Sequence, residues 1–347
     1  FEALANEAVG KLFAEDPEKV VELFEKIKRV TGGDAWMAFK ALANEAVGKL
    51  FAKDPEKVVG LFEKINKVGS KDAWMAFEAL DNEAVRKLFA EDPEKVIRAF
   101  EGVVRIASED AEKVFEALVY REVNEGELDF FIRLAGEADL RNRLKEEFNI
   151  DFIMRYPGGV LEDMLSGRRD PARPLAIIAY PKYDHNRAFY FNKIWQLYRA
   201  GFQVVVFESG NEGEFKEWMK RIVAKWGPAD VVVLGGHGKP QEIRLGAGES
   251  EENFLDVTDG DVLKALKPLV KPGGMFVLDS CSTGDSKTTD NIAQVISGST
   301  GTIVFAPERP TAISNFNIQY DENWRPVLDS VDYFGPTWVY KKGKRQD

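Results

Sequence analysis

Val231-Val232-Val233-Leu234-Gly235-Gly236-His237-Gly238 and Met275-Phe276-Val277-Leu278-Asp279-Ser280-Cys281-Ser282-Thr283-Gly284 are the stretches that decide the fold. Each is an apolar run, typical of a buried parallel strand, that ends in a turn with one reactive side chain. Active sites of open α/β sheets collect at such strand ends. We therefore expect the Cys281 thiol and the His237 imidazole to meet as a nucleophile and its base. The alternative for Cys281, the only cysteine, is a small buried apolar residue.

The sequence around these two runs alternates between strand and helix patterns. Strands are predicted over 175–180, 203–207, 230–234, 275–278 and 302–306, and helices over 189–199, 215–226, 262–270 and 292–296. Such alternation predicts a mainly parallel sheet with helices on both faces. His237 and Cys281 follow the third and fourth strands, so right-handed crossovers would place both side chains at one edge of the sheet.

The amino-terminal part of the chain is repetitive. Phe1-Glu2-Ala3-Leu4 recurs with little change at Phe39, Phe77 and Phe115, a spacing of 38 residues. An apolar stripe predicts one helix over 39–51, and Asp54-Pro55 supplies an N-cap and a first-turn proline for a second. Each unit is therefore predicted to be a helix pair, and stacked helix pairs form an α-solenoid. Because Phe1 begins partway through a unit, we expect further repeats before it in the native protein.

These patterns divide the chain into three parts. Residues 1–150 are expected to form the helical repeat domain with a capping segment from Glu122 to Phe148. Residues 151–174 are expected to be a connector, because Pro157-Gly158-Gly159 and the Pro- and Arg-rich stretch up to Pro174 interrupt the pattern. Residues 175–347 are expected to form the α/β domain. The apolar stripes of the repeats are interpreted as core, with their outer faces and groove open to a protein partner.

Composition restricts the class of protein. The chain has 347 residues and a net charge of −11, which argues against nucleic acid as a partner. One cysteine excludes an internal disulfide, and two histidines with one cysteine cannot supply a zinc site without carboxylates. No apolar run approaches the roughly 18 residues that a membrane span needs, so we expect no membrane association and a cytoplasmic location. A charged fraction of 30% suits a thermophile.

The two opening motifs together carry a family resemblance. Gly235-Gly236-His237-Gly238 with Leu278-Asp279-Ser280-Cys281-Ser282-Thr283-Gly284 resembles the catalytic pair of the caspase-like cysteine peptidases, which include caspases, metacaspases, clostripain-like enzymes, gingipains, separase and the CHAT peptidases. The resemblance covers roughly Leu175 to Lys341. It is nearest to metacaspases and clostripain-like enzymes, whose cysteine motif is similar to Asp-Ser-Cys-His-Ser-Gly. Ser282 and Thr283 depart from that motif. Helical repeats joined to such a domain resemble CHAT-type architectures.

The resemblance implies a caspase-like fold and a cysteine endopeptidase. Cys281 would attack the scissile carbonyl, His237 would transfer the proton, and the amides of Gly238 and Cys281 would form an oxyanion hole. Asp279 would line the specificity pocket and select Arg or Lys before the cleaved bond, with Asp285 adding charge at the rim. The alternatives are that Asp279 caps the following turn or meets a backbone amide, and that Asp285 is a loop residue.

Other features have plainer interpretations. No resident cofactor or metal is expected; the acidic stretch 248–261 suggests calcium activation by analogy with some metacaspases, or else a solvated loop without EF-hand spacing. His185 lies in no motif and is interpreted as a loop or cap residue. The alternative function is a catalytically inactive caspase-like scaffold that binds partner proteins. Gly235-Gly236-His237-Gly238 does not match the G-x-G-x-x-G spacing of a nucleotide site.

Overall fold

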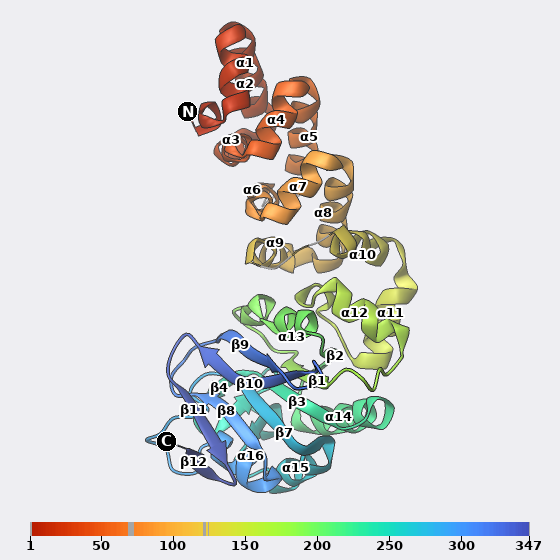
Figure 1. Ribbon diagram of the computed structural model, residues 1–347, viewed down its shortest axis with the longest axis vertical. Helices are drawn as coiled ribbons and strands as arrows, with labels where there is room; N and C mark the ends of the chain where they lie inside the picture. Colours follow the sequence, from red (N-terminus) through yellow and green to blue (C-terminus); the bar gives the residue numbers. More distant parts are fainter. Residues whose placement is uncertain (1, 69–72, 121–122, 124, 347) are drawn as a thin grey trace. The chain divides into compact units, whose positions relative to one another are not determined.

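A computed structural model describes residues 2–68, 73–120, 123 and 125–346, and the chain divides into two units, Phe1–Ala138 and Asp139–Asp347 (Figure 1). Phe1 and Glu122, where the sequence predicts a truncated repeat and the start of a capping segment, lie outside these residues. Within the described ranges, no helix combines the length and the apolar character that crossing a bilayer requires.

The first unit contains helices that recur with the sequence repeat. They are α1 (Glu7–Glu15), α2 (Pro17–Thr31), α3 (Ala35–Ala43), α4 (Glu45–Lys53), α5 (Pro55–Val68), α6 (Ala73–Glu78), α7 (Glu83–Glu91), α8 (Pro93–Ala107), α9 (Ala111–Tyr120) and α10 (Glu125–Gly136), with short 3-10 turns η1 (Glu2–Ala5), η2 (Gly32–Asp34), η3 (Ala79–Asp81) and η4 (Ser108–Asp110). Each helix contacts its counterpart one repeat along: α1 meets α4, α4 meets α7, α2 meets α5, and α5 meets α8. An equivalent pair of phenylalanines joins each long helix to the short helix that follows it. The ring centroids are 5.2, 5.4 and 5.1 Å apart in Phe24–Phe39, Phe62–Phe77 and Phe100–Phe115.

The prediction of a helix pair in each repeat is wrong, because an asparagine divides the first predicted helix. α3 ends at Ala43, and Asn44 adopts an extended conformation with φ −71° and ψ 141°. Its side chain then accepts a hydrogen bond from Ala46 N and caps α4. A short amide side chain offers the backbone this alternative to a continuous helix. The repeat therefore consists of two short helices and a longer one, as α3, α4 and α5 show.

The equivalent asparagines also link neighbouring repeats. Asn6 Nδ2 donates to Asn44 O at 2.8 Å, and Asn82 Nδ2 donates to Leu118 O at 2.8 Å. In the described part of the chain, the Asn44 side chain donates no matching bond to the third repeat. Two of the three junctions between repeats thus contain an amide clamp, and the middle one does not.

This difference predicts unequal costs for one substitution. Asp retains the capping oxygen of asparagine but not its N–H donor. Asn82→Asp therefore removes a buried hydrogen bond to the Leu118 carbonyl, whereas Asn44→Asp loses no such bond. We expect Asn82→Asp to lower the free energy of unfolding by about 1–3 kcal/mol, and Asn44→Asp by a few tenths. Urea unfolding followed by far-ultraviolet circular dichroism measures both; equal costs would show that the clamp contributes nothing.

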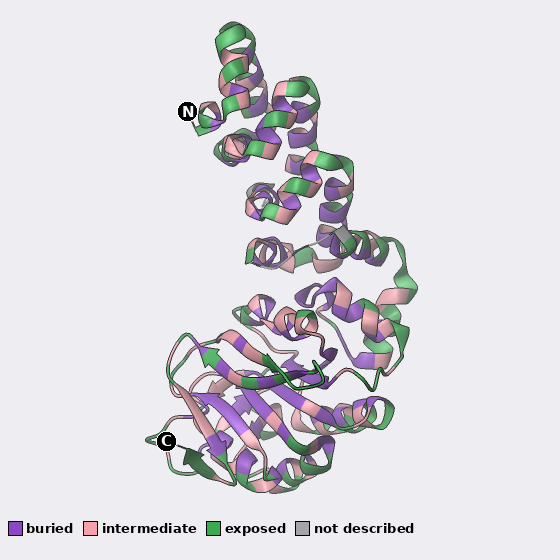
Figure 2. Ribbon diagram, viewed as in Figure 1, coloured by how far each residue is buried: buried purple, intermediate pink, exposed green. Residues whose placement is uncertain are grey.

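The second unit is built on a seven-stranded sheet whose strand order is β12-β11-β8-β7-β3-β1-β2 (Figure 1). Its strands are β1 (Leu175–Pro181), β2 (Gln203–Ser209), β3 (Ala229–Gly235), β7 (Val270–Asp279), β8 (Ile303–Pro307), β11 (Thr337–Lys341) and β12 (Lys344–Gln346). The five strands from β2 to β8 are parallel, and β11 and β12 are antiparallel additions. β1 and β2 are buried along their whole length (Figure 2). β1 is apolar throughout, whereas the apolar core of β2 is flanked by the buried polar residues Gln203, Glu208 and Ser209. The predicted mainly parallel sheet is confirmed.

Helices and two small sheets complete this unit. The helices are α11 (Ala138–Phe148), α12 (Gly158–Ser166), α13 (Ile194–Ala200), α14 (Glu212–Trp226), α15 (Gly260–Ala265) and α16 (Ile292–Thr300), and the small sheets comprise β4 (His237–Lys239), β5 (Glu242–Arg244) and β6 (Phe254–Asp256), and β9 (Ile313–Tyr320) with β10 (Pro326–Tyr333). The helix predicted over 262–270 is shorter than expected, since Pro268 lies in a 3-10 turn and β7 begins at Val270.

The prediction that residues 151–174 form a connector is wrong. This segment contains a 3-10 turn, η5 (Ile153–Arg155), and then α12, which packs against β2. Arg155 and Tyr156 are completely buried. Pro157 and its neighbouring glycines suggested a linker, but the apolar side chains around them supply core to the α/β unit. The boundary between the two units accordingly lies at Ala138, not near residue 150.

Candidate active site

The parallel strands bring the two reactive side chains to one edge of the sheet. β3 and β7 are neighbours, and Gly235 is in register with Asp279. His237 and Cys281 each lie two residues beyond these paired positions, His237 at the start of β4 and Cys281 in the turn after β7. Parallel strands end at the same edge, so both side chains lie beyond the carboxyl end of the sheet, where the sequence predicts them.

Both side chains line a single cavity of about 100 Å³. Asp279 and Ser280 also line this cavity, and its other walls come from the turn before α13 and from the segment that leads into β9. Cys281 is partly exposed, and its Sγ lies 3.9 Å from Thr311 O. The thiol therefore faces a space that can admit a ligand, which disfavours the alternative of a small buried apolar residue.

The backbone around Cys281 is arranged to leave one amide available. Ser282 N and Gly284 N donate to Arg309 O and Pro307 O, whereas Cys281 N donates to no acceptor among the described residues. Gly238 packs directly against this turn: a Cβ on Gly238 would overlap Ser280 Oγ and lie 3.1 Å from Cys281 N. Only glycine allows the main chain of β4 to approach the cysteine turn so closely.

A carboxylate that the sequence analysis did not identify anchors His237. Asp184 Oδ1 lies 3.1 Å from His237 Nε2, and the aspartate side chain is only 3% exposed. The two oxygens of Asp184 also accept hydrogen bonds from Ala188 N and Phe189 N. An ionised carboxylate only accepts hydrogen bonds, so Nε2 carries the proton in this contact and Nδ1 is left as the basic nitrogen.

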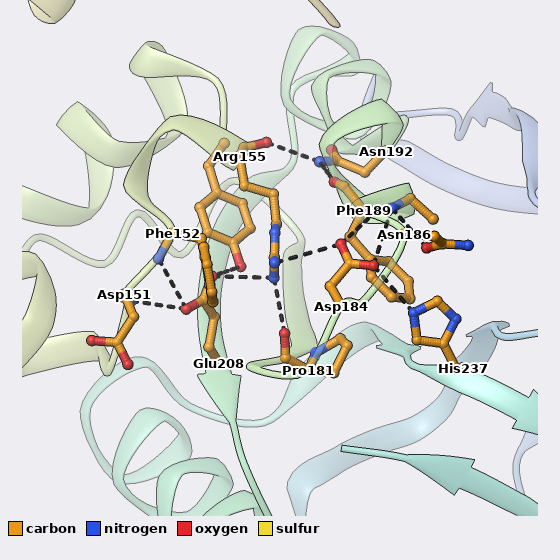
Figure 3. Close-up of polar contacts among 12 residues, drawn as sticks. Asp151, Phe152, Arg155, Pro181, Asp184, Asn186, Phe189, Asn192, Glu208 and His237 are labelled. Carbon is orange, nitrogen blue, oxygen red and sulfur yellow. Dashed lines mark hydrogen bonds and ion pairs between the residues drawn. The ribbon is translucent and has the colours of Figure 1, made fainter. Parts of the chain in front are cut away.

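Behind Asp184 lies a buried network of charges (Figure 3). Arg155 Nη2 is 3.6 Å from Asp184 Oδ2, and Arg155 Nη1 is 3.3 Å from Glu208 Oε1 and 2.9 Å from Pro181 O. Glu208 also accepts hydrogen bonds from Asp151 N, Phe152 N and Tyr156 Oη. Each buried charge thus has charged and hydrogen-bonding partners, as burial requires.

Electrostatics keep Asp184 ionised. Burial raises the pKa of the Asp184 carboxyl, but the hydrogen bond from His237 and the charge of Arg155 outweigh burial and leave that pKa below its ordinary value. At Glu208, by contrast, burial dominates and raises the pKa, although Arg155 opposes the shift. The network therefore supplies His237 with a carboxylate that remains negative at neutral pH.

Two further rings, those of His185 and Phe189, pack against the His237 imidazole. The His185 ring centroid is 4.3 Å from that of His237, and the Phe189 ring centroid is 5.6 Å away. His185 is exposed and belongs to a loop, as the sequence suggests, but it also packs on the functional histidine. The two rings are tilted by 43°, and His237 Nε2 keeps its hydrogen bond with Asp184.

Asp279 is a buried wall of the cavity. Its Oδ2 accepts a hydrogen bond from Tyr180 Oη at 2.9 Å, and it also accepts one from the Ile313 amide. Burial raises the pKa of Asp279 from 3.8 to about 6, even though these two bonds oppose the shift. Asp279 thus meets a backbone amide, as one interpretation expects, and it also lines the cavity; its role in specificity stays a prediction.

Asp285 lies elsewhere. It is not among the residues that line the cavity, and its carboxylate accepts hydrogen bonds from Lys287 N and Thr288 Oγ1. In the acidic stretch 248–261, Asp256 and Asp259 likewise serve local backbone amides. Over the part of the chain that the structure describes, no group of three or more His, Cys, Asp or Glu side chains could hold a metal ion. The structure thus assigns Asp285 to a loop turn.

Two site residues, Asp184 and Arg155, were not predicted from the sequence. Asp184 follows β1, the other neighbour of β3 in the sheet, so the strand-end rule places its loop at the same edge but does not single out this aspartate. The signal for Arg155 is a single cation within the apolar run Phe152-Ile153-Met154-Arg155-Tyr156, since a buried arginine requires a buried anion. Comparisons of the chain with protein-family models, with curated proteins and with solved structures found no match.

Proposed function

We propose that this protein is a cysteine endopeptidase of the caspase-like type. The observation that carries the proposal is the shared cavity of His237 and Cys281 at the carboxyl edge of β3 and β7, with the histidine anchored by a buried carboxylate. The order β2-β1-β3-β7-β8, with β11 antiparallel beside it, also supports the resemblance to that superfamily. A thiol, an oriented imidazole and an orienting acid form the arrangement of a nucleophile and its base.

The proposed reaction proceeds in two steps. Cys281 Sγ attacks the scissile carbonyl carbon, its proton passes to His237 Nδ1, and His237 then donates a proton to the departing amine as the C–N bond breaks. A water molecule next attacks the resulting thioester; His237 accepts its proton, and the carboxylic acid product leaves as the thiol is restored. Asp184 stays ionised throughout and stabilises the imidazolium that forms in each step.

The backbone supports the oxyanion hole that the resemblance implies. Negative charge develops on the carbonyl oxygen when the thiol adds, and amide donors aimed at this oxygen stabilise the transition state. Cys281 N is available for this purpose, and Gly238 brings a second stretch of main chain against the same turn. In the proposal, the amides of Gly238 and Cys281 both donate to the oxyanion.

Asp279 supports a preference for Arg or Lys before the cleaved bond, because a carboxylate in a largely buried wall favours a cationic guest. Its raised pKa gives this preference a pH dependence. Above about pH 6 the carboxyl is charged and attracts the cation, and below about pH 6 it is neutral. We expect the ratio of kcat/KM for an Arg substrate to that for a matched Leu substrate to rise as the pH increases through about 6.

The Asp279→Asn variant isolates this effect. It should remove the pH dependence of the Arg-to-Leu ratio and lower that ratio at pH 8 by about 10- to 100-fold. The variant is expected to stay folded. Because the folded-state pKa is raised, ionisation of Asp279 lowers stability as the pH rises from about 4 through about 6, the full cost remains at higher pH, and Asn avoids it. A ratio that is unchanged in the variant would assign Asp279 to structure alone.

The alternative, a scaffold without turnover, is tested with the same protein. A peptide with Arg and an electrophilic group in place of the scissile bond should form a covalent adduct with Cys281. Adduct formation together with cleavage of a reporter peptide supports the peptidase; if neither occurs in the intact chain, the scaffold is the better description. Because the chain contains one cysteine, mass spectrometry of the whole protein assigns the adduct without ambiguity.

A further inference from the structure

Three helices of the first unit, one from each of three successive repeats, are almost identical in sequence. α1, α4 and α7 read EAVGKLFAE, EAVGKLFAK and EAVRKLFAE. They differ at two positions only: Arg86 of α7 replaces a glycine, and Lys53 of α4 replaces a glutamate. Both differences add positive charge relative to the residue found at the same position of the other two helices.

Both exceptions also line the same groove. A groove of about 570 Å³ lies between α4 and α7. These two helices contact each other and are neighbours in the first unit (Figure 1). Its lining includes Lys53 and Arg86 together with Asn44 and two pairs of oppositely charged residues. The positions that vary between otherwise matching helices therefore converge on one surface.

The charges in the groove are unbalanced. Glu45 pairs with Lys49 at 2.5 Å and Glu83 pairs with Lys87 at 2.8 Å, so these four charges offset one another. Lys53 is exposed, and among the described residues neither Lys53 nor Arg86 forms an ion pair or a side-chain hydrogen bond. Arg86 Nε is moreover buried without a partner. Arg86 also interacts electrostatically with Glu83, whose contact partner is Lys87, so the groove keeps an excess of positive charge and Arg86 and Lys53 lack a contacting anion.

Arg86 also accounts for the opening of the groove. At the equivalent position of the preceding repeat, the Asn6 side chain packs so closely on Gly48 that a Cβ there would overlap it. An arginine excludes this approach, and Asn44 correspondingly makes no clamp to the third repeat and lines the groove instead. The single sequence difference at Arg86 therefore opens the groove between the second and third repeats and also supplies one of its positive charges.

We propose that the groove between α4 and α7 binds an acidic peptide segment of a partner protein. One carboxylate of the segment pairs with the Arg86 guanidinium and another with Lys53, while the free Asn44 amide donates to a peptide carbonyl. Arginine suits such a partner because its planar fork matches a carboxylate. This inference does not depend on the proposed peptidase activity.

The test uses the full chain and a short fluorescein-labelled peptide of alternating Glu and Ala, whose binding is followed by anisotropy. Arg86→Gly and Lys53→Glu restore the residues of the sister helices, so both variants should fold, which circular dichroism checks. Each is expected to raise the Kd for the peptide about tenfold, the loss of one charge-assisted contact. Lys11→Glu makes the same charge change on α1, outside the groove, and should leave the Kd unchanged.

Three results would overturn the proposal. The first is no saturable binding of the Glu peptide by the unmodified chain. The second is a rise in Kd for Lys11→Glu equal to that for Lys53→Glu, which would show attraction by overall charge and not by the groove. The third is displacement of the peptide by a single-stranded oligonucleotide at lower concentration than by unlabelled Glu peptide, which would make the groove a phosphate-binding surface.

Discussion

We expect Cys281→Ala to abolish the proposed cleavage of Arg-containing peptides and to leave the fold intact. The variant removes the only thiol of the chain and deletes one partly exposed sulfur atom from the cavity wall. The hydrogen bond from Cys281 Sγ to Thr311 O is long, at 3.9 Å, so its loss should lower the free energy of unfolding only slightly. Without the nucleophile no thioester forms, and we expect kcat/KM to fall by several orders of magnitude.

The measurement is a continuous assay with a fluorogenic Arg peptide, combined with mass spectrometry after exposure to an electrophilic Arg peptide. The unmodified chain should gain the mass of one adduct, and the variant should gain none. Ser282→Ala is the matched control, because it shortens the adjacent side chain and leaves the thiol in place. Cleavage by Cys281→Ala at an undiminished rate would mean that another group performs the chemistry and that the proposed mechanism is wrong.

The parts of the fold set by periodicity were predictable. Val231 to Leu234 and Phe276 to Leu278 form continuous apolar runs, and only a strand buried on both faces accommodates them. Because β3 and β7 are parallel, the chain direction alone then placed His237 and Cys281 at one edge. The sequence distance between the motifs was irrelevant, since the strands are neighbours in the sheet.

The parts that depend on tertiary partners were not predictable. The apolar stripe of 39–51 continues through Asn44 without interruption, so it contains no sign that the Asn44 side chain caps a new helix. The segment 151–156 shows a similar ambiguity, since Pro157 and its neighbouring glycines suggest a linker as readily as a turn. Its burial depends on Glu208, which lies 53 residues from Arg155 and accepts its hydrogen bond.

Asp184, the carboxylate that orients His237, could likewise not be identified from the sequence pattern. Asp184 lies in a loop with no motif, and its role follows from three contacts made in the folded state: with His237, with Arg155 and with the backbone of the next turn. A reactive side chain can be recognised by its type, because few residues carry a thiol or an imidazole. A positioning residue is an ordinary aspartate until its partners are known.

Asp184→Asn is expected to lower kcat by about 10²–10⁴-fold with little change in KM. The amide preserves the size of the side chain but removes the negative charge that stabilises the imidazolium. If its NH₂ group faces His237 Nε2, it also favours the tautomer with the proton on Nδ1, which cannot accept the proton of Cys281. A loss confined to kcat distinguishes positioning of His237 from binding of substrate.

His185→Ala is the matched control for this prediction, because His185 packs on the ring of His237 while the hydrogen bond of His237 Nε2 is made with Asp184. It should change kcat by less than about tenfold, since a ring contact of this kind is worth only about 0.5–1.5 kcal/mol. Unchanged circular dichroism and an unchanged midpoint of thermal unfolding in every variant exclude unfolding as the cause. If Asp184→Asn kept full kcat while His237→Ala lost it, the imidazole would act without its carboxylate, and the Asp184 contact would serve only the buried Arg155 network that holds residues 151–156 to the sheet.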